Sequence, residues 1–336
     1  SAGADPGPAC YGTGGKKPTV TDAAVVLGYI DPDHFLGGRM SLDIAAAEGV
    51  ISEIAEQLKM STEETAAGIL DIAGEQMIKA IQEITVQDGV NPAESILVAG
   101  GGAAGLNILP IAESLGCSKV LLPKTAGALS ACGGHYSDIV SEYSASRYSA
   151  TDNFDFDGVS KVFKEIGGKL DSEQKSLESR GISNFTREFF VEARYLNQQW
   201  EMEFKIPMLE IEDDADVKTL ISEFHNVHFR RYAVKEEGGV IECINWKGRL
   251  IAEMSKPPHA QSEAKKSTEM EADRTVSAYF SDKGHCKTPV YIGATLPSGC
   301  EISGPAIIEE PTTTVVVYPG SSATVTMSGH YLLTPA

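Results

Sequence analysis

Apolar residues follow two alternating patterns along the first 150 positions, short runs and helical spacing. The β-branched and then apolar run of residues 18–30 is typical of a strand, and it ends at a Pro/Gly turn in residues 31–38. Two helices are predicted next, one from Asp43 to Lys59 and one that opens with the capping-box pattern Ser-Thr-Glu-Glu at Ser61. Seven apolar residues of the second helix recur at helical spacing and predict a broad buried face: Ala66, Ile69, Leu70, Ala73, Met77, Ile81 and Ile84.

Strand and helix signals continue to alternate after the second helix. A short apolar strand is predicted over residues 96–99, followed by a glycine turn and a helix, and a second buried strand is predicted over residues 119–123. Residues 140–149 alternate as a strand does. This alternation favours an α/β domain with a buried, largely parallel sheet over residues 1–150.

The pattern changes near Ala150 and becomes richer in strands. The predicted elements are a helix within residues 153–181, strands on either side of Asn197, a helix through residues 217–227 and a strand within residues 238–254. A charged, Pro-containing stretch near residues 255–272 reads as a linker or long loop, and short β segments separated by Gly/Pro turns follow it. We therefore expect a β-rich α+β domain over residues 151–336. The large rings of Tyr195, Trp200 and Trp246 are expected to fill a core or an interface.

Composition narrows the classes of function. The chain has 28 Lys and Arg residues against 47 Asp and Glu residues, a formal net charge of −19. This balance argues against nucleic-acid binding and against docking on an anionic membrane. Hydrophobic content of 42% is ordinary for a globular protein, and no apolar run approaches the roughly 18 residues that a membrane span needs. Six cysteines lack CxxC spacing, so a reducing, cytoplasmic compartment is expected.

Metal-binding and nucleophilic candidates are sparse. His225 and His228 share one face of a predicted helix and could bind a metal ion, but no third ligand is evident near them. Cys132 could act as a nucleophile only beside a base, and none is identifiable, so a buried thiol is the simpler interpretation. His135 is interpreted as structural. We therefore expect no metal site made by this chain.

The sharpest local motif is a glycine-rich turn at residues 100–105, Gly-Gly-Gly-Ala-Ala-Gly, between a predicted strand and a predicted helix. Glycines at such a turn let the backbone approach a nucleotide, with the helix N-terminus facing it. A dinucleotide site would also need an acidic residue about 20 positions on, for the ribose. That region instead ends at Pro123-Lys124. An NAD(P) site is therefore disfavoured, and tight strand–helix packing is the structural alternative.

Two aspartates near the N-terminus are weak catalytic candidates. Asp5 lies in a Gly/Pro-rich loop and Asp22 lies in the run of residues 18–30. A carboxylate after a strand could orient a nucleotide or a metal ion. The alternative is that both side chains cap turns through their oxygens.

Several strings in this order resemble the hydantoinase A/5-oxoprolinase family, over nearly the whole chain. They are "SAGADPGPACYGTGG" with "PTVTDAAVVLGYIDPDHFLGG", then "VAGGGAAGLNILPIAESLG", "KVLLPKTAGALSACGGHYSDIVSEYSA" and "GPAIIEEPTTTVVVYPG". The segments "EFHNVHFRRYAV" and "NQQWEMEF" are most similar to the ATP-binding subunit of the acetophenone/acetone carboxylase branch.

The resemblance implies an actin-like, sugar-kinase-like ATPase fold with ATP between two α/β lobes. In that fold a glycine turn of the second lobe contacts the adenosine; the matching residues here are Gly100, Gly101, Gly102, Gly105 and Asn107. The family's D-x-G-G-T phosphate loops have no counterpart in the sequence. The chain is therefore expected to be the second ATPase lobe and C-terminal domain of a longer protein.

The implied chemistry depends on ATP with Mg²⁺. In the carboxylase branch ATP activates a ketone enol and bicarbonate, and in the hydrolase members it activates a cyclic amide that water then opens. The branch-like segments favour the ketone carboxylase, with the cyclic amide hydrolase and a non-catalytic assembly module as alternatives. A hydantoinase-B-like subunit and the missing N-terminal lobe are the expected partners. The wide apolar surface of the helix after Ser61 also predicts self-association or partner binding.

Overall fold

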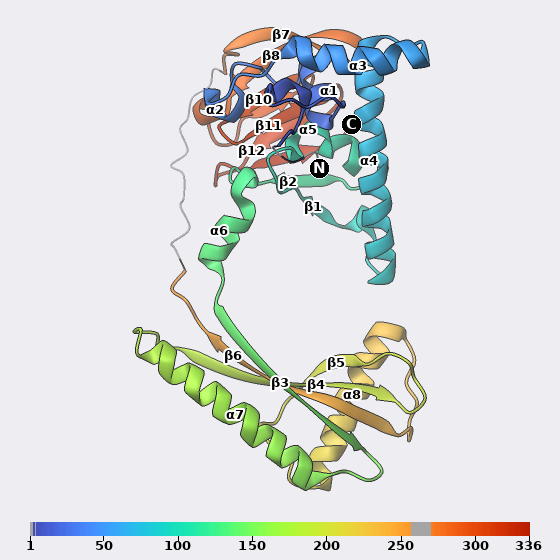
Figure 1. Ribbon diagram of the computed structural model, residues 1–336, viewed down its shortest axis with the longest axis vertical. Helices are drawn as coiled ribbons and strands as arrows, with labels where there is room; N and C mark the ends of the chain where they lie inside the picture. The colour runs from blue at the N-terminus through green and yellow to red at the C-terminus, as the bar shows by residue number, and fades with distance from the viewer. Residues whose placement is uncertain (1–2, 4, 257–269) are drawn as a thin grey trace. The chain divides into compact units, whose positions relative to one another are not determined.

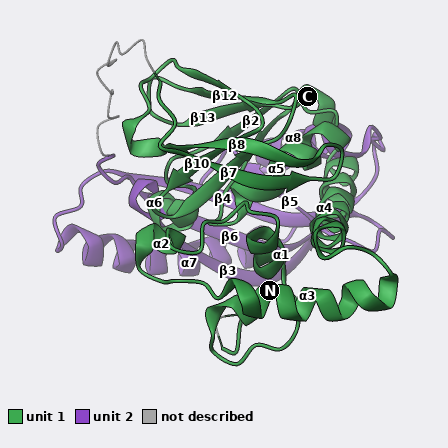
Figure 2. Ribbon diagram, turned by 90° about the horizontal axis from the view of Figure 1, so that it is seen from above, with its two compact units in different colours: residues 1–133, 258–336 green, residues 134–257 purple. Residues whose placement is uncertain are grey.

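The structure is a computed structural model that describes residues 3, 5–256 and 270–336. The chain forms two compact units, which Figure 2 shows in different colours. The first unit comprises residues 1–133 and 258–336, and the second unit comprises residues 134–257. The first unit is therefore built from both ends of the chain. This division by compactness differs from the sequence-based boundary near residue 150.

The first unit combines helices from the N-terminal part of the chain with strands from both parts (Figure 1). Its helices are α1 (Val20–Val26), α2 (Phe35–Gly38), α3 (Ile44–Leu58), α4 (Thr62–Gln87) and α5 (Ala104–Ser114), with short 3-10 turns at Ala9–Tyr11, Pro92–Glu94, Ala126–Ala128 and Gly293–Thr295. α6 (Leu129–Tyr136) carries the chain from the first unit into the second. The strands of the first unit are β1 (Ile96–Val98), β2 (Lys119–Leu122), β7 (Arg274–Phe280), β8 (Gly284–Ile292), β9 (Glu301–Ser303), β10 (Ala306–Glu310), β11 (Thr313–Val317), β12 (Ser322–Val325) and β13 (Tyr331–Thr334).

Two sheets hold the first unit together. One has the order β1-β2-β13-β12-β9 and the other the order β11-β10-β8-β7. Only the β1–β2 and β8–β10 pairs are parallel among the described strands, so the expectation of a largely parallel sheet is wrong. The cause is the last strand of the chain. β13 inserts beside β2 in antiparallel register, with Tyr331 opposite Leu122, and this pairing ties the C-terminal strands to the N-terminal part.

The N-terminal run of residues 18–30 forms a helix, α1, over Val20–Val26 rather than a strand. Thr19 and Asp22 form a capping box that starts α1: the Thr19 hydroxyl accepts from the Asp22 amide, and the Asp22 carboxylate accepts from the Thr19 amide. Capping satisfies backbone donors that a helix start leaves open, and it outweighs the β-branched composition of the run. Two alanines and one valine of α1 are fully or almost fully buried: Ala23, Ala24 and Val25.

Both predicted helices of residues 43–86 are confirmed, with Asp43 capping α3 and Ser61 in a capping box with Glu64 at the start of α4. The predicted buried face of α4 holds at Ala66 and Leu70. It fails at Met77 and Ile84, which are 41% and 61% exposed. The C-terminal half of α4 thus extends an apolar surface beyond its core contacts.

The second unit is one antiparallel sheet with two helices. Its elements are β3 (Ile139–Ala150), α7 (Phe156–Glu178), β4 (Phe185–Tyr195), β5 (Met202–Ile206), α8 (Asp214–Tyr232) and β6 (Ile241–Ala252), and the sheet order is β3-β6-β4-β5. Trp246 of β6 is fully buried and donates its indole N–H to the Arg147 carbonyl at 2.9 Å. Trp200 is 77% exposed in the β4–β5 turn, so it does not fill a core, and its place in an interface stays a prediction. The predicted linker near residues 255–272 lies mostly outside the described residues.

Candidate ligand site

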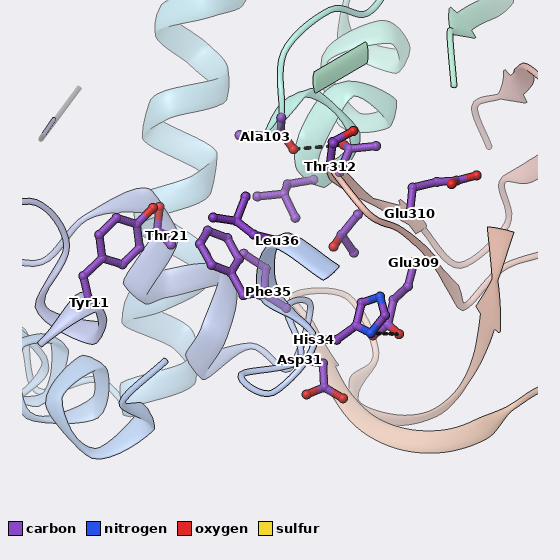
Figure 3. A pocket seen from close by; sticks show the side chains of 15 residues that line it. Tyr11, Thr21, Asp31, His34, Phe35, Leu36, Ala103, Glu309, Glu310 and Thr312 are labelled. Atoms are coloured by element: carbon purple, nitrogen blue, oxygen red, sulfur yellow. Dashed lines mark hydrogen bonds and ion pairs between the residues drawn. The ribbon is translucent and has the colours of Figure 1, made fainter. Parts of the chain in front are cut away.

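A pocket of about 210 Å³ lies within the first unit, where three stretches far apart in sequence meet (Figure 3). The N-terminal loop and α1 supply Tyr11 and Thr21, and the turn of residues 30–36 supplies Asp31, His34, Phe35 and Leu36. The glycine turn supplies Gly102 and Ala103, and the β10–β11 hairpin supplies residues 309, 310 and 312–314. Each of these segments belongs to one of the strings that carry the family resemblance.

Asp22 holds the N-terminal loop against this pocket. Its side chain is fully buried and accepts hydrogen bonds from the amides of Ala9, Cys10 and Thr19 and from the Thr19 hydroxyl, at 2.8–3.3 Å. All of these donors belong to the protein backbone or to a neighbouring side chain, so the capping role expected as the alternative is the one that the structure shows. Asp5 is exposed and does not line the pocket.

Two ionisable side chains of the N-terminal loop, Cys10 and Tyr11, are kept neutral by their surroundings. Burial, then a hydrogen bond and the charge of Asp22, raise the pKa of the Cys10 thiol to about 12. Burial, then the neighbouring Cys10 and Asp22, raise the pKa of Tyr11 above its usual value. The Tyr11 hydroxyl at the pocket is therefore protonated at neutral pH.

The glycine turn has separate uses for its glycines. Gly102 lines the pocket, and its carbonyl accepts from the Thr313 hydroxyl at 2.9 Å. Gly105 lets α5 approach β11, because a Cβ there would overlap the Thr314 carbonyl and lie 3.0 Å from the Val315 Cα. Gly101 has a φ of 118°, a conformation that favours glycine.

Gly100 and Asn107, the remaining predicted nucleotide contacts, do not line this pocket. Gly100 packs against the Leu129 side chain, and Asn107 faces a different cavity, which Asp71 and Tyr318 also line. Of the five predicted residues, the structure therefore places Gly102 at the pocket, beside Ala103.

Two carboxylates that line the pocket, Asp31 and Glu309, belong to a charged cluster around Arg274. Arg274 donates to the Glu309 Oε1 at 2.6 Å, to Asp31 and, at 3.1 Å, to Asp273. Burial by itself would lower the pKa of Arg274, but the hydrogen bond and charge of Glu309 and the neighbouring aspartates raise it instead. The two terminal nitrogens of the guanidinium are thus engaged by three protein carboxylates. An anionic group of a ligand would have to compete with them.

Glu310, the next residue of β10, has its own partners. Its Oε1 accepts from the buried Tyr331 hydroxyl at 2.5 Å and lies 3.5 Å from the Lys124 Nζ. Burial and this hydrogen bond raise the pKa of Tyr331. The pocket therefore combines two carboxylate residues on adjacent positions of one strand with apolar walls from Phe35, Leu36 and Leu106. Such a lining suits an uncharged, hydroxyl-bearing ring system better than a phosphate group.

The remaining candidates lie in other places. His225 and His228 each bond to protein groups of the second unit: His225 Nδ1 lies 2.5 Å from the Tyr195 hydroxyl and His228 Nδ1 lies 2.7 Å from the Val234 carbonyl. Cys132 is half-buried and His135 is exposed. Within residues 3, 5–256 and 270–336, no three His, Cys, Asp or Glu side chains are arranged to hold a metal ion.

The charged residues of the pocket were missed by motif reasoning. Glu309 and Asp31 sit more than 270 positions apart in the sequence, and the tertiary fold brings both to Arg274 of β7. The available signal was the string "GPAIIEEPTTTVVVYPG", which places two glutamates at the end of an apolar strand. None of the described helices is long and apolar enough to cross a membrane.

Comparison with known proteins identifies relatives of both parts of the chain. A family model described as "Hydantoinase/oxoprolinase" matches residues 1–143, and one described as "Hydantoinase/oxoprolinase C-terminal domain" matches residues 157–334. The caprolactamase subunit alpha of Pseudomonas jessenii is 32% identical over 100% of this chain and 49% of its own length. The acetophenone carboxylase gamma subunit of Aromatoleum aromaticum is 32% identical over 99% of this chain and 47% of its own.

The fold agrees with these matches. The crystal structure of the ATP-dependent caprolactamase from Pseudomonas jessenii superposes with a TM-score of 0.78 at 31% identity, covering 100% of this chain and 49% of that one. The chain thus has the mixed α/β, multi-sheet fold of that enzyme. It spans about half the length of these relatives.

Proposed function

We propose a function from one premise, that the chain belongs to the hydantoinase/oxoprolinase family. The chain is part of an ATP-dependent enzyme of that family, and the pocket beside Gly102 binds the adenosine portion of ATP. The supporting observation is convergence: segments of the family-like strings, from residues 11–36, 102–106 and 309–314, line one pocket. A pocket assembled from four of the five family-like strings is the natural place for a ligand that the family shares.

The chemistry of the lining supports adenosine over triphosphate. Apolar side chains provide walls for a base, hydroxyl and carboxylate groups provide partners for a sugar, and Arg274 is engaged by carboxylates. We propose that the phosphates and Mg²⁺ lie outside this pocket, at D-x-G-G-T loops of an N-terminal lobe, as in an actin-like ATPase. The first unit would then be the second lobe of that fold.

We infer the class of reaction only as far as the relatives agree on it. Caprolactamase and acetophenone carboxylase both act on a carbonyl compound by name, and the chain is equally identical to a subunit of each. We propose ATP-driven activation of a carbonyl substrate, with a hydantoinase-B-like partner subunit. Ketone carboxylation and cyclic amide hydrolysis are separated by measuring which substrate, a ketone with bicarbonate or a lactam, stimulates ATP turnover in the assembled enzyme. Absence of ATP turnover with both substrates would instead favour a non-catalytic assembly module.

Nucleotide binding is testable on the chain itself. Ala103 is exposed at the start of α5 and lines the pocket, so Ala103→Leu adds bulk to the pocket without enlarging a core residue. We expect calorimetry with ATP to show affinity lowered by roughly tenfold, the equivalent of about 1.4 kcal/mol. The matched control is Ala215→Leu, the same change at an exposed position in the first turn of α8. Equal ATP affinity in both variants would refute the assignment of the pocket.

A further inference from the structure

One oxygen of Glu309 has no hydrogen bond in the described part of the chain. Glu309 is 3% exposed, and while its Oε1 accepts from Arg274 at 2.6 Å, its buried Oε2 has no donor there. The His34 ring lies beside it, but its Nδ1 is 3.9 Å from this oxygen, beyond hydrogen-bond reach (Figure 3). A buried carboxylate oxygen without a donor is costly, so a partner that arrives with a ligand would relieve the cost.

The location of Glu309 indicates which group can donate to this oxygen. Glu309 lines the same pocket as Gly102 and Ala103, and Figure 3 shows its carboxylate beside the His34 ring. Glu309 also lines a second cavity, which it shares with Arg274. Because its Oε2 lies 3.9 Å from the ring of His34, which lines the first pocket, a ligand group that enters this pocket and displaces the ring is the donor to test.

Charge narrows the kind of donor. The cluster sets three carboxylates, Asp31, Asp273 and Glu309, against the single guanidinium of Arg274. An anionic ligand group would meet repulsion there, whereas a neutral O–H or N–H can donate without adding negative charge. The hydroxyl-rich segment of Thr312, Thr313 and Thr314 beside it offers further partners for a ligand with several hydroxyls.

A sugar with neighbouring hydroxyls has these properties. In dinucleotide sites an acidic residue placed after the glycine turn accepts from a ribose hydroxyl. Sequence spacing offers Pro123 and Lys124 at that place, but the fold brings Glu309 to the pocket from a distant strand. We propose that Glu309, through Oε2, accepts a hydrogen bond from a ribose hydroxyl of the bound nucleotide. This inference rests on the proposed function of the pocket.

The experiment compares ATP with 2′-deoxy-ATP and 3′-deoxy-ATP by calorimetry, on the unaltered chain and on Glu309→Gln. A hydrogen bond to a charged group is expected to be worth roughly 10- to 100-fold in affinity. The unaltered chain should lose that factor with at least one deoxynucleotide. Glu309→Gln should bind ATP correspondingly more weakly and should no longer distinguish the three nucleotides, because an amide can present a donor where an acceptor is needed.

The matched control is Asp273→Asn, which alters another carboxylate on Arg274 outside the pocket lining and should keep the preference for ATP. If the unaltered chain binds all three nucleotides equally, the role of Glu309 is refuted while the proposed function stands. If Glu309→Gln keeps the full preference, the role is refuted as well. If the unaltered chain binds none of them, both proposals fall. The comparison on the unaltered chain decides even if the variant does not fold.

Discussion

Each of the two units contains a cluster of carboxylates and basic side chains, but the clusters differ in whether every carboxylate oxygen has a hydrogen-bond donor. In the second unit Glu192, Glu203 and Glu142 alternate with Lys247 and Arg249 across the sheet, and we call this set the charged ladder. Both oxygens of Glu192 and both of Glu203 have donors, at 2.6–2.8 Å. In the first unit the cluster around Arg274 leaves one oxygen of Glu309 without a hydrogen bond among the described residues.

Exposure sharpens the difference. The ladder side chains are 17–37% exposed on one face of a sheet, so water screens the charges. Glu309 is 3% exposed, where an incomplete set of partners is costly. The fold alone explains the charged ladder, because both oxygens of Glu192 and of Glu203 have donors within the protein. The buried oxygen of Glu309 has no donor among the described residues and needs a partner from outside them.

The largest expected effect tests whether Asp22 belongs to the scaffold of that pocket. Asp22→Ala should leave three backbone amides without their acceptor and lower the free energy of unfolding by about 3 kcal/mol or more. Thermal unfolding followed by circular dichroism measures the loss. Removal of a ladder carboxylate, Glu192→Ala, should cost about 1 kcal/mol or less. If Asp22→Ala were as stable as the unaltered chain yet inactive in the assembled enzyme, Asp22 would be catalytic rather than structural.

A smaller effect is expected from adding one methyl group in each unit. Gly105→Ala places a Cβ against the Thr314 carbonyl, and forcing β11 away from α5 should cost about 1–3 kcal/mol. Gly168→Ala, in the interior of α7, meets nothing within 4 Å and should gain about 0.5–1 kcal/mol from helix propensity. Melting temperatures of the two variants should therefore shift in opposite directions. Shifts of the same sign would contradict the close approach of α5 and β11.

Local signals predicted the elements better than the way they meet. Capping residues such as Asp43 and Ser61 mark helices that the structure confirms, because capping is decided within a few residues. The same local rule explains residues 18–30. The Thr-x-x-Asp cap at Thr19 starts α1 and outweighs the β-branched composition that predicts a strand.

Strand pairing and the candidate site depend on long-range contacts. Nothing near residue 120 indicates that β13 will insert beside β2, so the parallel sheet was expected wrongly. The glycine motif correctly indicated a backbone that approaches another segment closely, and Gly102 does line the pocket. Glu309 could not be found by spacing from that motif. It reaches the pocket through the pairing of β10 with β8 and β11.

The smallest effect is expected at the charged ladder, and it carries a definite pH dependence. Hydrogen bonds from Lys247 and Asn245 hold the pKa of Glu192 below its ordinary 4.5. For Glu203, burial pushes the pKa upward, but hydrogen bonds from Lys247 and Arg249 outweigh it and the pKa is lowered. A lowered carboxyl pKa adds stability that is present above about pH 4.5 and is lost as the pH falls through the lowered value.

Lys247→Met should therefore lower the free energy of unfolding by about 1 kcal/mol or less at pH 7, since the pairs are partly exposed. It should also reduce the loss of stability on acidification below pH 4.5, because the two glutamates would no longer owe their lowered pKa to this lysine. Urea unfolding at pH 7 and at pH 3.5 measures both the free energy of unfolding at neutral pH and its loss on acidification. Lys79→Met, at an exposed pair with Glu83 on α4, is the matched control and should change neither. A large loss at pH 7 in Lys247→Met would mean that the ladder stabilises its unit as strongly as a buried network does, and the contrast between the two clusters would then rest on the unpaired oxygen of Glu309 alone.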